Sequence, residues 1–146
     1  MAQLTFSGKP VLAGEAVGEI LASLEPLSFW GGYNWETGEI TDRHHSLSGA
    51  RGSGRILAIP FSRGSSTTTA VLLEAIRAGT APKAILTVTN DFFFALASVV
   101  ASELYNQTLP IVALPEADFA SLQTGDWAEI ETNGTIRVRR EAIADA

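Results

Sequence analysis

Three apolar runs of strand length mark the middle of the chain, at residues 55–60, 84–88 and 110–114. Each run is nearly continuous in Ile, Leu, Val and Ala, and the first closes on a proline before a polar loop. Uninterrupted apolar runs of this length are typical of strands buried on both faces of a sheet. We therefore predict three buried strands.

Two segments between these strands have helical spacing. Residues 67–78 place apolar side chains three and four positions apart, and Gly79 follows where a helix C-cap is expected. Residues 92–105 follow Asn90 and Asp91, either of which can cap a helix N-terminus. Strands that alternate with helices predict an α/β fold with parallel strands and right-handed crossovers.

The first fifty residues are rich in glycine and divided into short pieces. We predict short strands at residues 4–6, 16–24 and 36–42, with an aromatic turn at residues 29–33. By propensity alone, residues 19–24 could also form a helix.

The C-terminal part alternates apolar and polar residues on either side of Asn133-Gly134. This pattern predicts a β-hairpin of residues 127–132 and 135–139, because Asn-Gly is a strong turn signal between two strands. Residues 139–146 are interpreted as a charged tail. No repeat or linker divides the chain, so we expect one domain over residues 1–146.

The predicted helix at residues 92–105 is apolar nearly all round, beginning with Phe92, Phe93 and Phe94. Such a helix must be covered on more than one side. We expect it to lie inside the fold between two sheets. The alternative is that the side bearing the three phenylalanines docks on a partner chain.

Charge and cysteine content narrow the classes of function. Ten Lys and Arg against sixteen Asp and Glu give a net charge of −6, which disfavours nucleic acid and anionic membranes as partners. The chain contains no Cys, so an iron–sulfur cluster would have to belong to another polypeptide. The first residues lack the pattern of a signal peptide, so we expect a cytoplasmic protein.

The loop at residues 61–69 is the strongest candidate for chemistry. It lies between a predicted buried strand and the start of a helix, where free backbone N–H groups favour bound anions. Arg63 adds a positive charge, Gly64 permits a close turn, and hydroxyls follow at Ser65, Ser66 and Thr67. A simple helix cap with a solvated arginine is the alternative.

Two weaker features lie earlier in the chain. His44 and His45 are the only histidines. Neighbours on an extended chain point to opposite sides, so a surface or turn role is favoured over a metal site. Trp30, Gly31 and Gly32 could form a wall over a small ligand, although a turn that packs against its own core is the favoured interpretation.

Three segments of the chain carry a resemblance to a known family. They are Glu25–Gly32 with Glu36–His45, Pro60–Thr67, and Leu72–Ile85. Together they resemble the small subunit, or swivel domain, of the aconitase X family. The loop around Gly64-Ser65-Ser66 is also similar to the Gly-Ser-Ser-Arg loop of aconitases and isopropylmalate isomerases, with Thr67 in place of their arginine.

The resemblance implies a swivelling β/β/α domain with a parallel or mixed sheet. It also implies a hydro-lyase whose active site closes when this domain docks on a large subunit that carries iron or an iron–sulfur cluster. This chain would bind no cofactor itself and would contact a small hydroxy acid. By the same resemblance, Ser65 would be the catalytic acid or base. The substrate-binding residues would be Arg63, Gly64, Ser66, Thr67, Trp30, Gly31 and Gly32.

The family includes dehydratases of cis-3-hydroxy-L-proline and of phosphorylated mevalonate. Ser65-Ser66-Thr67 resembles the former group more closely, so we expect cis-3-hydroxy-L-proline as substrate and pyrroline-2-carboxylate as product. Thr68 and Thr69 replace the Gly-Ser that many relatives carry, which leaves the substrate less certain than the reaction class. Two alternatives stay open: a phosphomevalonate dehydratase subunit, and a non-catalytic module that binds a carboxylate or regulates a partner.

Overall fold

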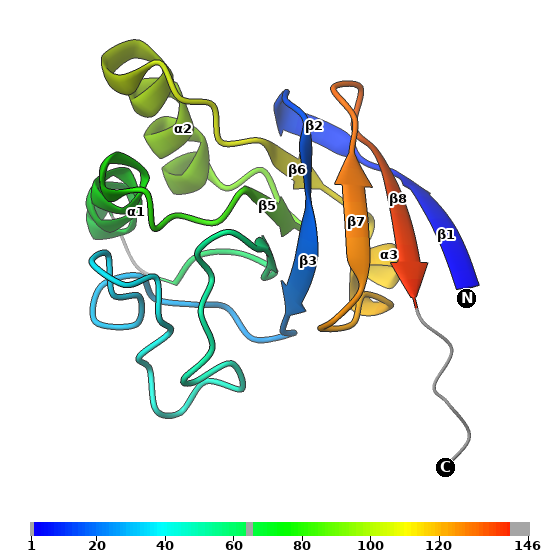
Figure 1. Ribbon diagram of the computed structural model, residues 1–146, viewed down its shortest axis with the longest axis horizontal. Coiled ribbons are helices and arrows are strands. Elements are labelled where there is room, and N and C mark those ends of the chain that lie inside the picture. The colour runs from blue at the N-terminus through cyan, green and yellow to red at the C-terminus, as the bar shows by residue number, and fades with distance from the viewer. Residues whose placement is uncertain (1, 64–65, 141–146) are drawn as a thin grey trace.

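Four parallel strands form the centre of the protein, in a computed structural model that describes residues 2–63 and 66–140 (Figure 1). The three strands predicted from the apolar runs are buried almost throughout, whereas the fourth is only partly buried. Neighbouring strands are in direct register, with Leu57 opposite both Leu21 and Ile85. The strands are β3 (Ala16–Ala22), β4 (Ile56–Ala58), β5 (Ala84–Thr87) and β6 (Ile111–Ala113), in that order; β3 and β4 are parallel, as are β4 and β5, and β5 and β6.

Two helices cross over between the parallel strands and pack against each other on one side of the sheet (Figure 1). They are α1 (Ser66–Ala78) and α2 (Phe92–Tyr105). Helix α1 ends at Gly79, whose φ of +79° suits a residue without a Cβ. Asp91 caps α2, as predicted. No helix in the described ranges is long and apolar enough to cross a membrane.

An antiparallel arm continues the sheet from β3. It consists of β7 (Trp127–Ile130), β8 (Thr135–Arg140) and β1 (Ala2–Ser7). Strands β7 and β8 form the predicted hairpin, with Ile130 opposite Ile136. Gly134, in the turn, has a φ of +93°, which explains the Asn-Gly pair at this point.

The sheet curls until its two edges approach each other. The strand order is β1-β8-β7-β3-β4-β5-β6-β2, where β2 (Lys9–Leu12) pairs with β6. Only Gly8 separates β1 from β2, although these strands lie at opposite edges of the sheet, so the sheet must be nearly barrel-like. A side chain at position 8 would overlap Val112. The backbone N–H of Gly8 donates to the carbonyl oxygen of Gly134. The lack of a Cβ therefore allows the closure.

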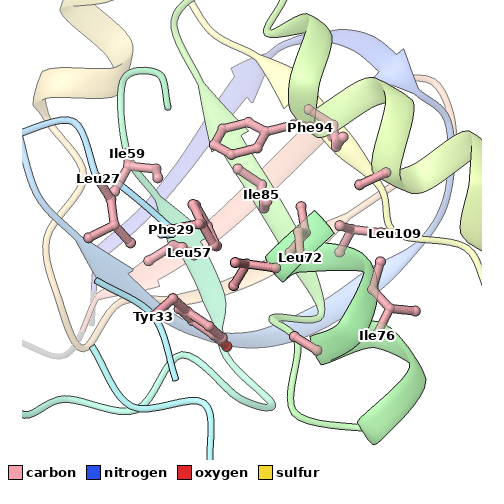
Figure 2. Packing of buried hydrophobic residues seen from close by; sticks show 14 of the residues in the cluster. Leu27, Phe29, Tyr33, Leu57, Ile59, Leu72, Ile76, Ile85, Phe94 and Leu109 are labelled. Atoms are coloured by element: carbon pink, nitrogen blue, oxygen red, sulfur yellow. The ribbon is translucent and has the colours of Figure 1, made fainter. Parts of the chain in front are cut away.

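Two apolar clusters hold the three layers together. The first lies between the helices and the parallel strands, and it includes Phe29, Tyr33, Leu72 and Phe94 (Figure 2). The second lies between the parallel strands and the antiparallel arm, and it includes side chains from β4, β6, β7 and β8. The protein therefore has three layers: the antiparallel arm, the parallel strands and the two helices. This confirms the expected β/β/α architecture with a mixed sheet and a C-terminal hairpin.

The structure corrects several local predictions. Residues 36–42 form turns with isolated bridges instead of a strand, because their hydrogen bonds close small loops within residues 31–52. The interpretation of residues 19–24 as a helix is wrong, since β3 runs through Ala22. A short helix, α3 (Glu116–Ala120), was not predicted. Arg139 and Arg140 belong to β8 and not to a tail, and residues 141–146 lie outside the described part.

Helix α2 lies in the outer layer and not between two sheets, which corrects the favoured expectation (Figure 1). Its buried residues are Phe94, Ala97, Ser98 and Ala101, on the face toward α1 and β2. The opposite face is open, and Phe92 is 66% exposed. One buried face is enough because its small residues let α1 approach closely. Docking of the exposed face on a partner stays a prediction.

An ion pair between a buried carboxylate and a partly exposed arginine fixes the end of β8. Asp126 is 2% exposed, and its two carboxylate oxygens each lie 2.8 Å from the guanidinium of Arg140. The N–H of Gln123 also donates to this carboxylate. Burial by itself raises the pKa of Asp126, but the hydrogen bonds from Arg140 and Gln123 outweigh it, so this pKa lies below its ordinary value.

We expect Arg140→Gln to lower the free energy of unfolding by about 2–3 kcal/mol at pH 7, because it leaves a buried carboxylate without its cation. A depressed carboxyl pKa stabilises the fold above the unfolded value, about 3.9, and this contribution is lost as the pH falls through the folded value. The difference in unfolding free energy between Arg140→Gln and the wild type should therefore become smaller below about pH 4.

Arg139→Gln is the matched control for this prediction. Arg139 lies one residue away, and its exposed guanidinium is 3.9 Å from Glu129, so it should change stability by no more than about 0.5 kcal/mol. Urea titrations at pH 7 and near pH 3.5 measure both variants. If Arg140→Gln and Arg139→Gln lose the same unfolding free energy at pH 7, the ion pair of Arg140 with Asp126 does not contribute as predicted.

Candidate active site

The loop that follows β4 is held by one carboxylate. Asp91 Oδ2 accepts hydrogen bonds from both the backbone N and the Oγ of Ser62, each at 2.7 Å. Its Oδ1 accepts from the N–H groups of Phe93 and Phe94, at 3.0 and 3.1 Å. Asp91 is 8% exposed, and four donors satisfy its charge. The same side chain therefore caps α2 and fixes the beginning of the candidate loop.

The predicted substrate-binding residues around Ser65 are only partly described. The backbone N–H of Arg63 donates to the carbonyl oxygen of Leu27 at 2.9 Å, and its side chain is exposed. Gly64 and Ser65 lie outside the described residues. Ser66 is the first residue of α1, and Thr67 is exposed in its first turn. The first turn of α1 contains no acidic residue, so the positive end of its dipole is not neutralised there.

The aromatic turn lies beside this loop, and its side chains divide between the core and the surface. Phe29 is fully buried and stacks on Tyr33, with ring centroids 5.2 Å apart, so these two residues pack in the core (Figure 2). Trp30 is 71% exposed and lines a cleft of about 320 Å³ together with Gly31 and Gly32. A side chain at Gly32 would overlap the carbonyl oxygen of Ser28, so the tight turn requires glycine there.

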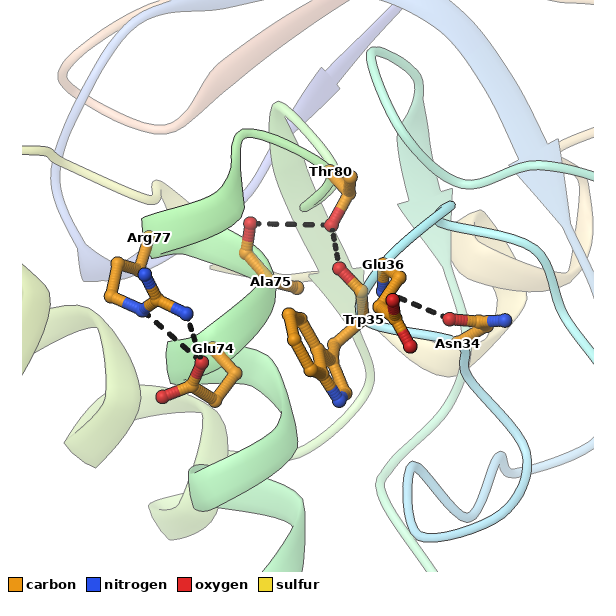
Figure 3. Close-up of polar contacts among 7 residues, drawn as sticks. All are labelled: Asn34, Trp35, Glu36, Glu74, Ala75, Arg77 and Thr80. Carbon is orange, nitrogen blue, oxygen red and sulfur yellow. Dashed lines mark hydrogen bonds and ion pairs between the residues drawn. The ribbon is translucent and has the colours of Figure 1, made fainter.

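The far side of the aromatic turn is anchored to the end of α1. The hydroxyl of Tyr33 donates to the carbonyl oxygen of Thr80 at 2.6 Å, and burial raises the pKa of this phenol so that it stays a donor. The hydroxyl of Thr80 donates to the carbonyl oxygen of Trp35, as Figure 3 shows. These two bonds tie the segment that follows the aromatic turn to the end of α1.

The two histidines have different environments. His45 is 5% exposed, its Nδ1 accepts from the N–H of Leu47 at 3.1 Å, and its Nε2 lies 3.2 Å from the carbonyl oxygen of Glu25. This is a structural role in a turn, but a buried one and not at the surface. His44 is exposed and lines the cleft beside Trp30. The described residues contain no group of three His, Cys, Asp or Glu side chains that could hold a metal ion.

The structure brings most of the described candidate residues to one end of the parallel sheet. Leu27 forms a parallel bridge with Ser62, so the aromatic turn begins next to the loop of Arg63. Arg63 is not among the residues that line the cleft. The second role of Asp91 was missed, because only the fold places it against a residue 29 positions away. Its sequence signal was limited to helix capping.

The arrangement of an antiparallel arm, a parallel sheet and a helical layer defines the class as a swivelling β/β/α domain. The structure is similar to the crystal structure of holo aconitase X from Thermococcus kodakaraensis, with a TM-score of 0.83, 27% identity, and coverage of 94% of this chain and 99% of that chain. The model of the aconitase X swivel domain matches residues 5–138. The chain therefore belongs to the aconitase X swivel domain family, which confirms the resemblance found in the sequence.

Relatives of two kinds match the chain. It is 45% identical over 134 residues to a cis-3-hydroxy-L-proline dehydratase from Pseudomonas aeruginosa and 37% identical over 131 residues to one from Hypocrea jecorina, covering 92% and 90% of this chain. It spans only 23% and 22% of the length of those two proteins. It is 33% identical to the phosphomevalonate dehydratase small subunit of Thermococcus gammatolerans, covering 89% of this chain and 93% of that subunit.

Proposed function

We propose that this chain is the small, swivelling subunit of a heteromeric hydro-lyase that removes water from cis-3-hydroxy-L-proline and yields pyrroline-2-carboxylate. One observation carries the choice of substrate: the chain is 45% and 37% identical to two cis-3-hydroxy-L-proline dehydratases across nine-tenths of its length. The identity to the archaeal phosphomevalonate dehydratase small subunit is lower, at 33%.

The proposed chemistry needs a group that moves a proton and groups that hold a carboxylate. Elimination takes a proton from the carbon beside the carboxylate and releases the neighbouring hydroxyl as water. Ser65 is proposed as the acid or base. A free serine is a poor base, so its alkoxide would need the positive end of α1 and the charge of Arg63. The lack of acidic residues in the first turn of α1 supports this assignment.

Ser66, Thr67 and Arg63 are proposed to orient the substrate, together with the backbone at Gly64. The turn of Trp30, Gly31 and Gly32 is proposed to line the same pocket, and its bridge to Ser62 through Leu27 supports the assignment. Asp91 is proposed to act by holding the start of this loop, because its carboxylate accepts hydrogen bonds from both the N–H and the hydroxyl of Ser62.

A larger partner polypeptide is proposed to complete the active site. The dehydratases that match this chain over less than a quarter of their length contain much more protein than this chain supplies. The partner is the proposed carrier of iron or an iron–sulfur cluster, which would act as a Lewis acid on the substrate. This chain has no cysteine to ligate a cluster. The exposed face of α2 is available for docking.

A phosphomevalonate dehydratase small subunit is the second candidate. The observation in its favour is length, since this chain covers 93% of the small subunit from Thermococcus gammatolerans. In that case Arg63 and the loop amides would hold a phosphate.

Assay of water elimination tests the proposal. This chain is co-expressed with its aconitase-like partner, and both cis-3-hydroxy-L-proline and phosphorylated mevalonate are supplied to the pair and to each chain alone. Turnover of hydroxyproline by the pair only is expected. Turnover of phosphorylated mevalonate, with inhibition by inorganic phosphate, would select the second candidate. An assembled, metal-loaded pair that converts neither would overturn both.

A further inference from the structure

The cleft beside the aromatic turn has a second wall that the site assignments above do not use. Two segments of the chain form its walls, one with Ser28, Trp30, Gly31 and Gly32 and one with Thr41, Asp42, Arg43 and His44. Its volume of about 320 Å³ is within the range of small-ligand sites. The cleft begins close to the backbone of Arg63, because Leu27, adjacent to Ser28, accepts the N–H of Arg63.

Backbone contacts hold the two walls in place. The N and Oγ1 of Thr41 donate to the carbonyl oxygens of Gly32 and Gly31, each at 3.0 Å. Asp42 Oδ1 accepts the N–H of His44 at 3.0 Å, and its carbonyl oxygen accepts the N–H of His45. The buried ring of His45 ties this turn to Glu25. The side chains at positions 43 and 44 are thus carried by a fixed backbone.

Arg43 and His44 are the hydrogen-bond donors of this wall, and neither side chain forms an ion pair with an acidic residue in the described part of the chain. Arg43 and His44 are exposed and form no ion pair with any carboxylate in the described part of the chain, whereas Arg55, Arg77 and Arg140 each do. Asp42 is the one carboxylate on the same wall, and the N–H of His44 already occupies one of its oxygens. An unpaired guanidinium on a chain of net charge −6 is suited to an anionic ligand.

The indole of Trp30 adds an apolar surface to the same cleft. It is 71% exposed, so its large apolar area is not buried in the core. A flat apolar surface in one cleft with a guanidinium and an imidazole fits a small ring that bears a carboxylate.

We propose that this cleft binds the carboxylate of the substrate, with Arg43 and His44 as its donors and Trp30 against the ring. The inference rests on the proposed function and assigns two further binding residues to that site. Arg43 supplies two parallel N–H groups to the carboxylate, His44 supplies a ring N–H, and the positions of both are set by the turn at Asp42.

The first test is kinetic and uses the assembled pair. Arg43→Gln is expected to raise KM for cis-3-hydroxy-L-proline by about 10- to 100-fold, the usual value of a charge-assisted hydrogen bond, with kcat changed much less. His44→Gln should raise KM less, since the glutamine amide can still donate. Arg51→Gln is the matched control, because Arg51 is an exposed arginine nearby in the chain that does not line the cleft. An unchanged KM in Arg43→Gln would overturn the assignment.

The second test does not depend on turnover. With only this chain labelled with ¹⁵N in the assembled pair, pyrrole-2-carboxylate is titrated and the amide signals of Gly31, Gly32 and His44 are followed. Saturable shifts that disappear in Arg43→Gln and are not produced by the neutral pyrrole-2-carboxamide are expected. The carboxylate site would be overturned if inorganic phosphate shifts these signals and pyrrole-2-carboxylate does not, or if no ligand shifts them in the wild type. Either result would count even if the pair proves active on hydroxyproline. Shifts in a pair that does not turn over hydroxyproline would keep the site and reject only the substrate.

Discussion

Replacing Ser65 with alanine is expected to abolish turnover by the assembled pair while leaving assembly unchanged. A general acid or base contributes on the order of 10²–10⁴-fold to rate, and Ser65 is the only proposed proton carrier on this chain, so we expect a loss of at least about 10³-fold in kcat. Loss of one hydroxyl from a loop leaves the apolar clusters intact, so the thermal stability of the chain should change little. Steady-state kinetics and light scattering of the complex measure the two effects.

Ser7→Ala is the matched control for Ser65→Ala. Ser7 is exposed in β1, on the antiparallel arm and away from the helical layer, and its variant should retain full activity. If the complex with Ser65→Ala assembles and turns over within a few-fold of the wild type, Ser65 is not the acid or base. The chain would then be a non-catalytic swivel module.

Removing the Asp91 carboxylate should affect both stability and activity. In Asp91→Ala, α2 loses its N-cap and the partly buried donors of Ser62 lose their acceptor, which together cost about 2–4 kcal/mol of unfolding free energy. The loop that begins at Ser62 would also be released from α2. Since small misplacements of catalytic groups are costly, we expect kcat to fall on the order of 10²-fold. Urea denaturation and turnover measure the two losses.

Asp91→Ser separates the two roles of this carboxylate. A serine can still cap α2 by accepting from the N–H of Phe93 or Phe94, but it lacks the second oxygen that reaches Ser62. Its stability should therefore lie between those of the wild type and Asp91→Ala, while its kcat stays low. A variant with full activity would show that the contact to Ser62 has no part in catalysis.

The predictions that succeeded used signals that lie close together in the chain. The apolar run at residues 55–60, the cap at Asp91 and the Asn133-Gly134 turn each gave the correct element, because burial, capping and turn chemistry act over a few residues. The strand predicted at residues 36–42 was wrong, since its local polarity pattern does not reveal that its partners lie within residues 31–52.

Some residues of the candidate site could likewise be predicted from local signals, and others could not. Arg63 and the hydroxyl-rich loop after β4 could be selected from residue types and from their place between a strand and a helix. The cleft at Trp30 could be predicted only as one of two alternatives, because the sequence does not tell which aromatic side chains are buried. Arg43 had no usable signal, since nothing local distinguishes it from other exposed polar residues. His44 stood out only as one of two histidines, and a surface or turn role was favoured for it.

The sequence by itself determined the alternation of strands and helices, the candidate loop and the family, all of which depend on local pattern and on short motifs. Only the tertiary structure decided that Gly8 closes the sheet against Gly134, that one face of α2 is exposed, and that Asp91 holds Ser62. These contacts join residues far apart in the chain. Their free energy depends on which surfaces the whole fold brings together, and no local pattern specifies that.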